Sequence, residues 1–181
     1  MARIAVLGSG SGSNFQSLYE TFGDKIVLVI SDQPGAGILE KARRAGIPAV
    51  VEKGGFDLSA RILDHLEGID LVCLAGFMRL VKEPLLSAFP HRILNIHPSL
   101  LPKYPGLGAW EQAVLDEASE SGCTVHYVDA GMDTGEVILQ AEVPVLPGDT
   151  PESLHERIQV EEHRIYPLAV KSCLARITDE V

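Results

Sequence analysis

An amide and an imidazole stand two residues apart within residues 92–106, where Asn95 and His97 close an apolar run. Side chains at positions i and i+2 of a strand point to the same face, so both groups can reach one reacting atom. A neutral imidazole can take part in proton transfer near neutral pH, and an amide can donate to an oxygen that gains charge. The pair therefore predicts acid–base and oxyanion chemistry.

A carboxylate that could complete this set is Asp133, which stands in a turn framed by Gly131 and Gly135. It could orient and polarise the imidazole, or relay a proton through water. No serine in a GxSxG context and no HExxH pair accompanies it. The residues thus favour chemistry on an acyl carbon with no evident covalent or metal-dependent step.

A glycine-rich stretch, GSGSGSN at residues 8–14, follows the first apolar run and opens a helical pattern. Small residues let the backbone approach a ligand, and free amides at a helix N-terminus favour an anion. The glycines do not match GxGxxG and the lysine of a P-loop is missing, so a single phosphate ester fits better than a dinucleotide or triphosphate. Taken alone, the glycines fit a tight turn without a ligand equally well.

The stretch AGFMRL at residues 75–80 also follows an apolar run, and it would meet the first loop at one sheet edge. Arg79 could face an anion there, beside an apolar wall, although ordinary packing is the alternative. His126 fits either this crevice or the core. The remaining candidates for surface positions are His65, His91 and His155.

Apolar runs alternate with helical patterns, which predicts an α/β fold with a single doubly wound, mostly parallel sheet flanked by helices. We expect strands at 3–7, 25–31, 48–51, 71–75 and 92–96, and helices at 13–21, 38–45, 59–67 and 83–89. A helix at 110–118 then precedes strands at 123–128 and 135–145, which predicts antiparallel additions to the sheet. A last helix is expected at 151–169.

Composition restricts the partners. The chain has 181 residues, of which 46% are hydrophobic, and its net charge of −10 argues against a nucleic-acid partner. Three cysteines without a CxxC pair suit reduced thiols and give no metal signature. Because there is neither a signal-peptide pattern nor a long apolar run, we expect a cytoplasmic protein that does not bind a membrane.

The block NIHPSLLPKYPG, preceded by LAGFMRL and followed by MDTGEVILQ and EHRIYP, resembles the phosphoribosylglycinamide formyltransferase family of purine synthesis. The similarity covers residues 3–170 in one order. It implies a formyltransferase fold and transfer of a formyl group from the co-substrate 10-formyltetrahydrofolate to the amine of glycinamide ribonucleotide, without a metal. We then expect one domain over 1–181, with a nucleotide-phosphate half at 1–100 and a folate and catalytic-loop half at 101–181.

The resemblance also assigns roles residue by residue. The catalytic trio would be Asn95, His97 and Asp133. The ribonucleotide would be held by Gly12, Ser13, Asn14, Gln159 and Glu162. The folate pocket would be lined by Met78, Arg79, Leu80, Val81, Leu94, Asn95 and the 129–133 turn that begins with Asp129, with Arg79 near the glutamate tail.

The chain departs from this family in two places. Gly108, Ala109 and Trp110 follow YPGL, where many relatives carry a histidine. Residues 51–67 form a short segment, in which Arg61 is a candidate for the basic phosphate ligand that relatives often supply.

Two related activities remain as alternatives. Formyltetrahydrofolate deformylase shares the trio but transfers the formyl group to water, and it normally has an N-terminal regulatory domain, which we do not expect here. Methionyl-tRNA formyltransferase needs a C-terminal RNA-binding domain and a basic surface, which we do not expect either. We expect small-molecule partners only, in a monomer or homodimer.

Overall fold

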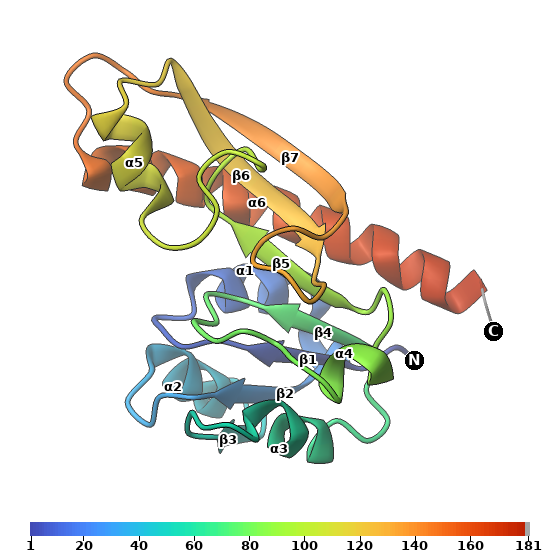
Figure 1. Ribbon diagram of the computed structural model, residues 1–181. Coiled ribbons are helices and arrows are strands. Elements are labelled where there is room, and N and C mark those ends of the chain that lie inside the picture. The colour runs from blue at the N-terminus through green and yellow to red at the C-terminus, as the bar shows by residue number, and fades with distance from the viewer. Residues whose placement is uncertain (180–181) are drawn as a thin grey trace.

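The computed structural model describes residues 1–179, which form one seven-stranded sheet with helices on both faces (Figure 1). The strands are β1 (Ile4–Leu7), β2 (Ile26–Ser31), β3 (Ala49–Val51), β4 (Leu71–Leu74), β5 (Ile93–His97), β6 (Glu120–Tyr127) and β7 (Val137–Pro144). The helices are α1 (Ser13–Phe22), the 3-10 helix η1 (Gly23–Lys25), α2 (Gly37–Arg44), α3 (Leu58–Asp64), α4 (Leu85–Ala88), α5 (Ala109–Leu115) and α6 (Pro151–Asp179). Residues 180–181 of the predicted domain lie outside the described residues.

Alternation along the strands divides the apolar side chains between two cores. In β1, Ile4 and Val6 belong to the core that α1, α2, α5 and α6 cover, whereas Ala5 and Leu7 belong to the core under α3 and α4. Successive side chains of a strand point to opposite faces, so an all-apolar strand must be covered on both sides. The apolar strands therefore require helices on both faces of the sheet.

The strand order is β3-β2-β1-β4-β5-β6-β7. Strands β1 to β5 run parallel, while β6 pairs antiparallel with β5 and with β7. The predicted α/β class, with a mostly parallel sheet and antiparallel strands in the C-terminal part, is confirmed. From β1 the chain first adds strands on one side and then returns to β4 on the other, which is the switch point where ligands bind in open α/β sheets.

Helix α6 differs most from the prediction, because it continues past residue 169 to Asp179. Pro167 lies inside it and removes one backbone donor, which normally favours an end or a kink. Burial of one face offsets that loss: Tyr166, Val170 and Cys173 recur at helical spacing in the core. The Tyr166 hydroxyl also donates to the carbonyl of Leu74, which holds α6 against β4.

Within residues 1–179, no helix combines the length and the apolar character needed to cross a membrane.

Candidate active site

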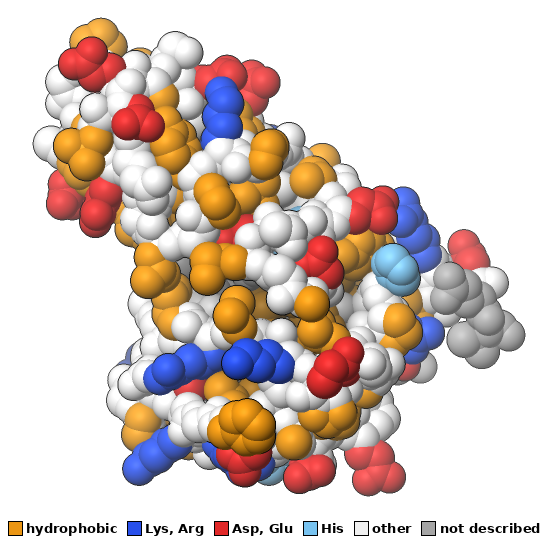
Figure 2. Space-filling model, in the orientation of Figure 1, with side chains coloured by type: hydrophobic (Ala, Val, Ile, Leu, Met, Phe, Trp, Pro, Cys, Tyr) orange, Lys and Arg blue, Asp and Glu red, His pale blue; other side chains and the backbone are white. Residues whose placement is uncertain are grey.

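A cleft of about 440 Å³ opens at the carboxyl ends of β1, β4 and β5. Its volume is in the range of small-molecule sites. The loops after these strands line it together with α6 and the turn that follows β6. Figure 2 shows hydrophobic side chains gathered across the middle of this face, with Lys and Arg side chains below them. Exposed apolar residues that line the cleft are Met78, Leu80, Leu107 and Met132.

Asn95 of β5 lies directly opposite His126 of β6, and both side chains line the cleft. His126 Nδ1 lies 2.8 Å from the carbonyl oxygen of Tyr127, so this nitrogen carries the proton and donates. His126 Nε2 then accepts from Asn95 Nδ2 at 3.2 Å. Because His126 Nε2 accepts, the amide atom of Asn95 that faces it is the nitrogen. The second N–H of this nitrogen points toward Asp133 Oδ1, and the distance from Nδ2 to Oδ1 is 3.5 Å.

His97, two residues along β5, is buried and oriented by a backbone group. Its Nε2 lies 2.7 Å from the carbonyl oxygen of Tyr104, which can only accept, so Nε2–H donates. The Nδ1 atom is left facing Asp133 Oδ2 at 3.4 Å. The carbonyl of Tyr104 in the proline-rich loop therefore orients this imidazole from one side, and the Asp133 carboxylate faces it from the other.

Asp133 is held by the same loop, since Gly106 N–H donates to its Oδ2 at 2.8 Å. Its φ of 55° places it in the left-handed region, which Asp tolerates better than most residues. Burial by itself would raise the pKa of Asp133, but His126, the Gly106 amide and the charge of His97 outweigh it and lower the pKa. Asp133 is therefore ionised at neutral pH, beside Asn95 and His97.

The contacts among these three side chains are all longer than good hydrogen bonds. Asp133 lies 3.4 Å from His97 Nδ1 and 3.5 Å from Asn95 Nδ2. Donors and acceptors in unliganded active sites are often loose in this way, and tighten when a substrate is bound. The arrangement leaves one amide N–H and one imidazole nitrogen for a reacting group. No set of three or more His, Cys, Asp or Glu in residues 1–179 is arranged to hold a metal ion.

The glycine-rich loop forms the opposite wall, with Gly12, Ser13 and Asn14 at the start of α1. Gly12 has φ of 80°, and a Cβ there would lie 2.8 Å from Cα of Ile38, so only glycine fits. The first backbone bond of the helix runs from Gln16 N–H to the Gly12 carbonyl, which leaves the preceding amides for another partner. Free amides in this position suit an anion.

Glu162 of α6 lies beside this loop and is only 5% exposed. Burial raises its pKa to about 7, and the hydrogen bond from Asn14 Nδ2 at 3.3 Å offsets this in part. Among the described residues, the buried Asn14 Oδ1 has no hydrogen-bond partner. Such unsatisfied polar groups are rare in interiors, so this pair is suited to a hydroxyl-bearing ligand. Gln159, one turn earlier on α6, also lines the cleft.

His155 is not an isolated surface residue, contrary to expectation. Its ring stacks on Trp110 of α5, with centroids 3.9 Å apart and planes 6° from parallel, and both residues line the cleft. Burial lowers the pKa of His155, against the opposing charge of Glu156. Gly108 and Trp110 therefore lie in the wall of the cleft, whereas Ala109 between them is buried in the core.

The predicted folate-side residues reach the cleft with one exception. Met78, Arg79, Leu80, Val81 and Asp129 all line it. Leu94 does not, because its side chain is 0% exposed in the core on the other face of β5. Asp129 stabilises its own turn, where its Oδ1 accepts from Gly131 N–H and from the Thr134 hydroxyl.

The predicted basic phosphate ligand Arg61 is not in the cleft. Its guanidinium bonds to Glu52 Oε2 at 2.9 Å, and also to Asp57 and to the carbonyl of Lys53. All three partners precede α3, to which Arg61 belongs. Arg61 therefore stabilises this segment. Its guanidinium is occupied by these ion pairs and does not face the cleft.

The sequence did not mark the cleft-lining residues Trp110 and His155 as site residues, nor Asp32, which is buried behind the cleft. One signal was present for His155, which precedes Gln159 by four residues and so shares its helical face. Asp32 directly follows the apolar strand β2, at the same edge as the predicted loops. No local pattern marks Trp110, whose stacking partner is far along the chain.

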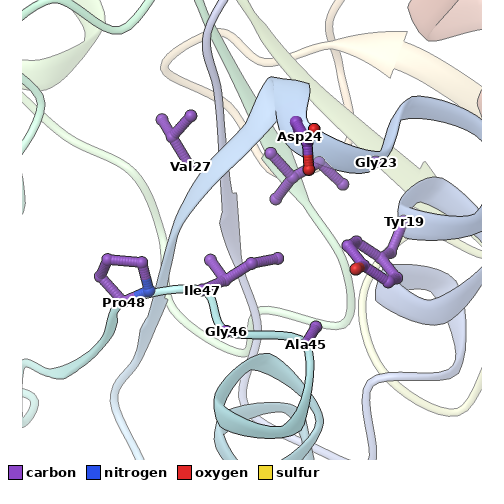
Figure 3. A pocket seen from close by; sticks show the side chains of 9 residues that line it. Tyr19, Gly23, Asp24, Val27, Ala45, Gly46, Ile47 and Pro48 are labelled. Atoms are coloured by element: carbon purple, nitrogen blue, oxygen red, sulfur yellow. The ribbon is translucent and has the colours of Figure 1, made fainter.

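A second hollow, of about 250 Å³, lies at the opposite edge of the sheet. Figure 3 shows its lining, in which Tyr19 and Asp24 supply the polar side chains beside apolar residues such as Ile47. Neither polar side chain is buried. This hollow does not bring together the acid–base groups found in the cleft.

The chain is similar to known proteins over most of its length. The family described as Formyl transferase matches residues 2–170. The chain is 46% identical to the trifunctional purine biosynthetic protein adenosine-3 of Drosophila melanogaster over 182 aligned residues, and 42% identical to that of Homo sapiens. The alignments cover 93% and 94% of this chain but only 14% and 18% of those relatives, so the chain spans a small part of their length.

Solved structures match over nearly their whole length. Glycinamide ribonucleotide transformylase 1 from Symbiobacterium toebii superposes with a TM-score of 0.91 at 51% identity, covering 94% of this chain and 86% of that one. Phosphoribosylglycinamide formyltransferase from Streptococcus pneumoniae TIGR4 gives 0.90 at 44% identity, covering 96% and 99%.

Proposed function

This chain belongs to the formyl transferase family, and we propose that it transfers the formyl group of 10-formyltetrahydrofolate to the amine of glycinamide ribonucleotide, which yields the formylated ribonucleotide and tetrahydrofolate. One observation carries the proposal: Asn95, His97 and Asp133 meet in the same cleft as the amides of the glycine-rich loop. The cleft thus combines groups for acyl transfer with a site for an anionic substrate.

The reaction needs no nucleophile from the protein, because the free amine of the ribonucleotide attacks the formyl carbon. A C–N bond forms, the bond from that carbon to N10 of the folate breaks, and one proton passes from the glycinamide nitrogen to N10. The formyl oxygen carries negative charge in between. The second N–H of Asn95 is placed to donate to it, and such a donor contributes roughly 3–4 kcal/mol in comparable oxyanion sites.

His97 and Asp133 would manage the proton. Because Nε2–H of His97 is fixed on the Tyr104 carbonyl, Nδ1 is the atom that gains and loses a proton in the cleft. Asp133 faces this atom at 3.4 Å, so the two side chains can together pass the proton from the amine toward N10. The Gly106 amide keeps Asp133 in place while this occurs.

The two substrates would occupy opposite walls. The free amides at the start of α1 suit the phosphate, with Gln159 beside them, and the Asn14–Glu162 pair suits ribose hydroxyls. The apolar residues Met78, Leu80 and Val81 suit the folate rings, with Arg79 available to its carboxylate tail. The proposed division does not follow the two halves 1–100 and 101–181, because the proposed folate residues Met78 to Val81 lie in the first half and Gln159 and Glu162, proposed for the ribonucleotide, lie in the second.

We also infer a cytoplasmic location from the proposed place in purine synthesis, and we propose a monomer or homodimer.

The decisive experiment mixes purified protein with 10-formyltetrahydrofolate, with and without glycinamide ribonucleotide, and follows the absorbance of tetrahydrofolate. We expect product only when the ribonucleotide is present, in equal amount with the formylated ribonucleotide. Equal rates without the ribonucleotide, with release of formate, would indicate a hydrolase and overturn the proposal.

A further inference from the structure

A buried carboxylate lies behind the cleft and outside the set of proposed site residues. Asp32 follows β2, and its side chain is fully enclosed. An ionised group is costly to bury unless other groups bond to it, so its partners indicate what it holds in place.

The two oxygens of Asp32 hold different loops. Oδ1 accepts from the Ser9 hydroxyl at 2.5 Å, in the loop after β1. Oδ2 accepts from Arg79 Nε at 2.8 Å, in the loop after β4, and from Gln33 Nε2 at 3.1 Å. The Ser9 oxygen in turn accepts from Met78 N–H at 2.9 Å, which closes a ring of bonds between the loops.

These contacts keep Asp32 charged. Burial would raise its pKa, but the hydrogen bonds from Ser9, Arg79 and Gln33 outweigh that effect and lower it. An ionised Asp32 therefore pairs with Arg79 at neutral pH. Bonds to a buried charge are stronger than bonds between neutral groups, so the ring is a rigid link.

Each loop of the ring serves a different substrate under the proposed function. Ser9 directly precedes residues 10–14, which line the ribonucleotide wall, and Arg79 belongs to the folate wall. Arg79 is 48% exposed and bonds to Asp32 through Nε alone among the described residues, which leaves its Nη groups for a ligand carboxylate. Movement of either loop must change the geometry at the shared carboxylate.

We propose that Asp32 is a positioning residue that couples the two substrate loops, because its single carboxylate holds Ser9 of one loop and Arg79 of the other. The inference rests on the proposed function. It predicts that each substrate, by ordering its own loop, pre-orders the loop of the second substrate, so that the two bind cooperatively.

The test uses calorimetry with two ligands that cannot react with each other, glycinamide ribonucleotide and tetrahydrofolate. The coupling factor is the Kd of tetrahydrofolate alone divided by its Kd with saturating ribonucleotide. We expect a factor of about five or more for the unchanged protein, as is typical of coupled sites.

The variant Asp32→Asn should reduce this factor and weaken tetrahydrofolate binding by several-fold. Its amide carries no charge to pair with Arg79, and the Ser9 hydroxyl would have to turn and accept from the new NH2 group, so the link between the loops is weakened, although the backbone bond from Ser9 N–H to the Gly76 carbonyl remains. Ser9→Ala is the second variant, because it cuts the link to Met78 N–H while leaving the pair with Arg79. It should reduce the factor in the same direction.

Asp57→Asn is the matched control, since Asp57 also pairs with an arginine but lies outside the cleft-lining residues. It should leave the coupling factor unchanged. A factor of one in the unchanged protein, or a factor that survives both Asp32→Asn and Ser9→Ala, would overturn the inference. Failure of the proposed function is distinct from these outcomes, because the unchanged protein would then neither bind the ribonucleotide nor formylate it.

Discussion

The ring of Trp110 lies flat on the ring of His155, and this contact joins α5 to α6 at the rim of the cleft. The stacked pair forms part of the wall of the cleft, one turn of α6 from Gln159. Aromatic pairs of this kind contribute about 0.5–1.5 kcal/mol beyond the area that they bury. The stack therefore holds α5 against α6 beside the residues that we propose for the ribonucleotide.

Replacement of Trp110 tests this wall. Trp110→Ala should raise the KM for glycinamide ribonucleotide by about threefold to tenfold, with a smaller change in kcat, because a stacking partner is lost and not a reacting group. Trp110→Phe keeps a ring and should show a smaller effect. Leu115→Ala, at an exposed position on the same helix, is the control. An unchanged KM for glycinamide ribonucleotide in Trp110→Ala would show that the Trp110–His155 stack does not contribute to binding of this substrate.

The proposed proton path predicts a loss of turnover without a loss of fold. His97→Ala and Asp133→Asn should each lower kcat by about 10²–10⁴-fold, the usual contribution of a positioned acid or base. Asn tolerates the positive φ of Asp133 and its Oδ1 can still accept from Gly106 N–H, so only the charge is removed. His65→Ala, outside the cleft, is the control, and thermal unfolding checks the fold. Near-normal kcat in both variants would exclude these side chains from the reaction.

The raised pKa of the buried Glu162 predicts that this residue lowers the free energy of unfolding as the pH rises. Its pKa rises from 4.5 to about 7 on folding, so the native state keeps a proton that the unfolded state loses between these values. Stability that is present below about pH 4.5 is thus lost as the pH rises through 7. The side chain of the Glu162→Gln variant cannot ionise. The difference in free energy of unfolding, variant minus unchanged protein, should therefore be roughly 2–3 kcal/mol larger at pH 8 than at pH 5.

Denaturant unfolding at both pH values measures this gain, and Glu156→Gln, exposed on the same helix, controls for the removal of a carboxylate. Glu162→Gln should at the same time bind the ribonucleotide more weakly. If the variant and the unchanged protein differ in free energy of unfolding by the same amount at pH 5 and at pH 8, the prediction is wrong.

The glycine-rich loop predicts a contrast between two glycines. Gly12→Ala should destabilise the protein by more than about 1 kcal/mol, because φ is 80° and the new Cβ would clash with the backbone of Ile38. Gly10→Ala meets no atom within 4 Å and should change the melting temperature far less. Equal melting temperatures for the two variants would show that the loop is not held as tightly as its contacts indicate.

The strands could be predicted from the sequence because burial on both faces leaves uninterrupted apolar runs, such as Leu71–Leu74. The shared face of Asn95 and His97 followed from strand period alone. Helix α6 was predicted to end at residue 169 but continues to Asp179, because the burial of Val170 and Cys173 depends on a sheet formed elsewhere.

Contacts between distant residues could not be predicted. Asp32 meets Ser9 and Arg79 across 23 and 47 residues, and a single sequence carries no signal for such pairs. The hydrogen bond from His97 Nε2–H to the Tyr104 carbonyl could not be predicted either, because every residue has a backbone carbonyl and the sequence does not show which one lies near the imidazole. Family resemblance identified side chains, whereas the bonds that orient them required the fold.

Strand β5 pairs in parallel with β4 and antiparallel with β6, and the groups that we propose for the reaction lie on β5 and in the turn after β6. A slip of β6 by one residue would place Val125 or Tyr127 opposite Asn95 and turn His126 to the other face. Such a protein would keep its secondary structure and lose its active site. Formyl transfer would therefore be a more sensitive measure of correct strand register than circular dichroism.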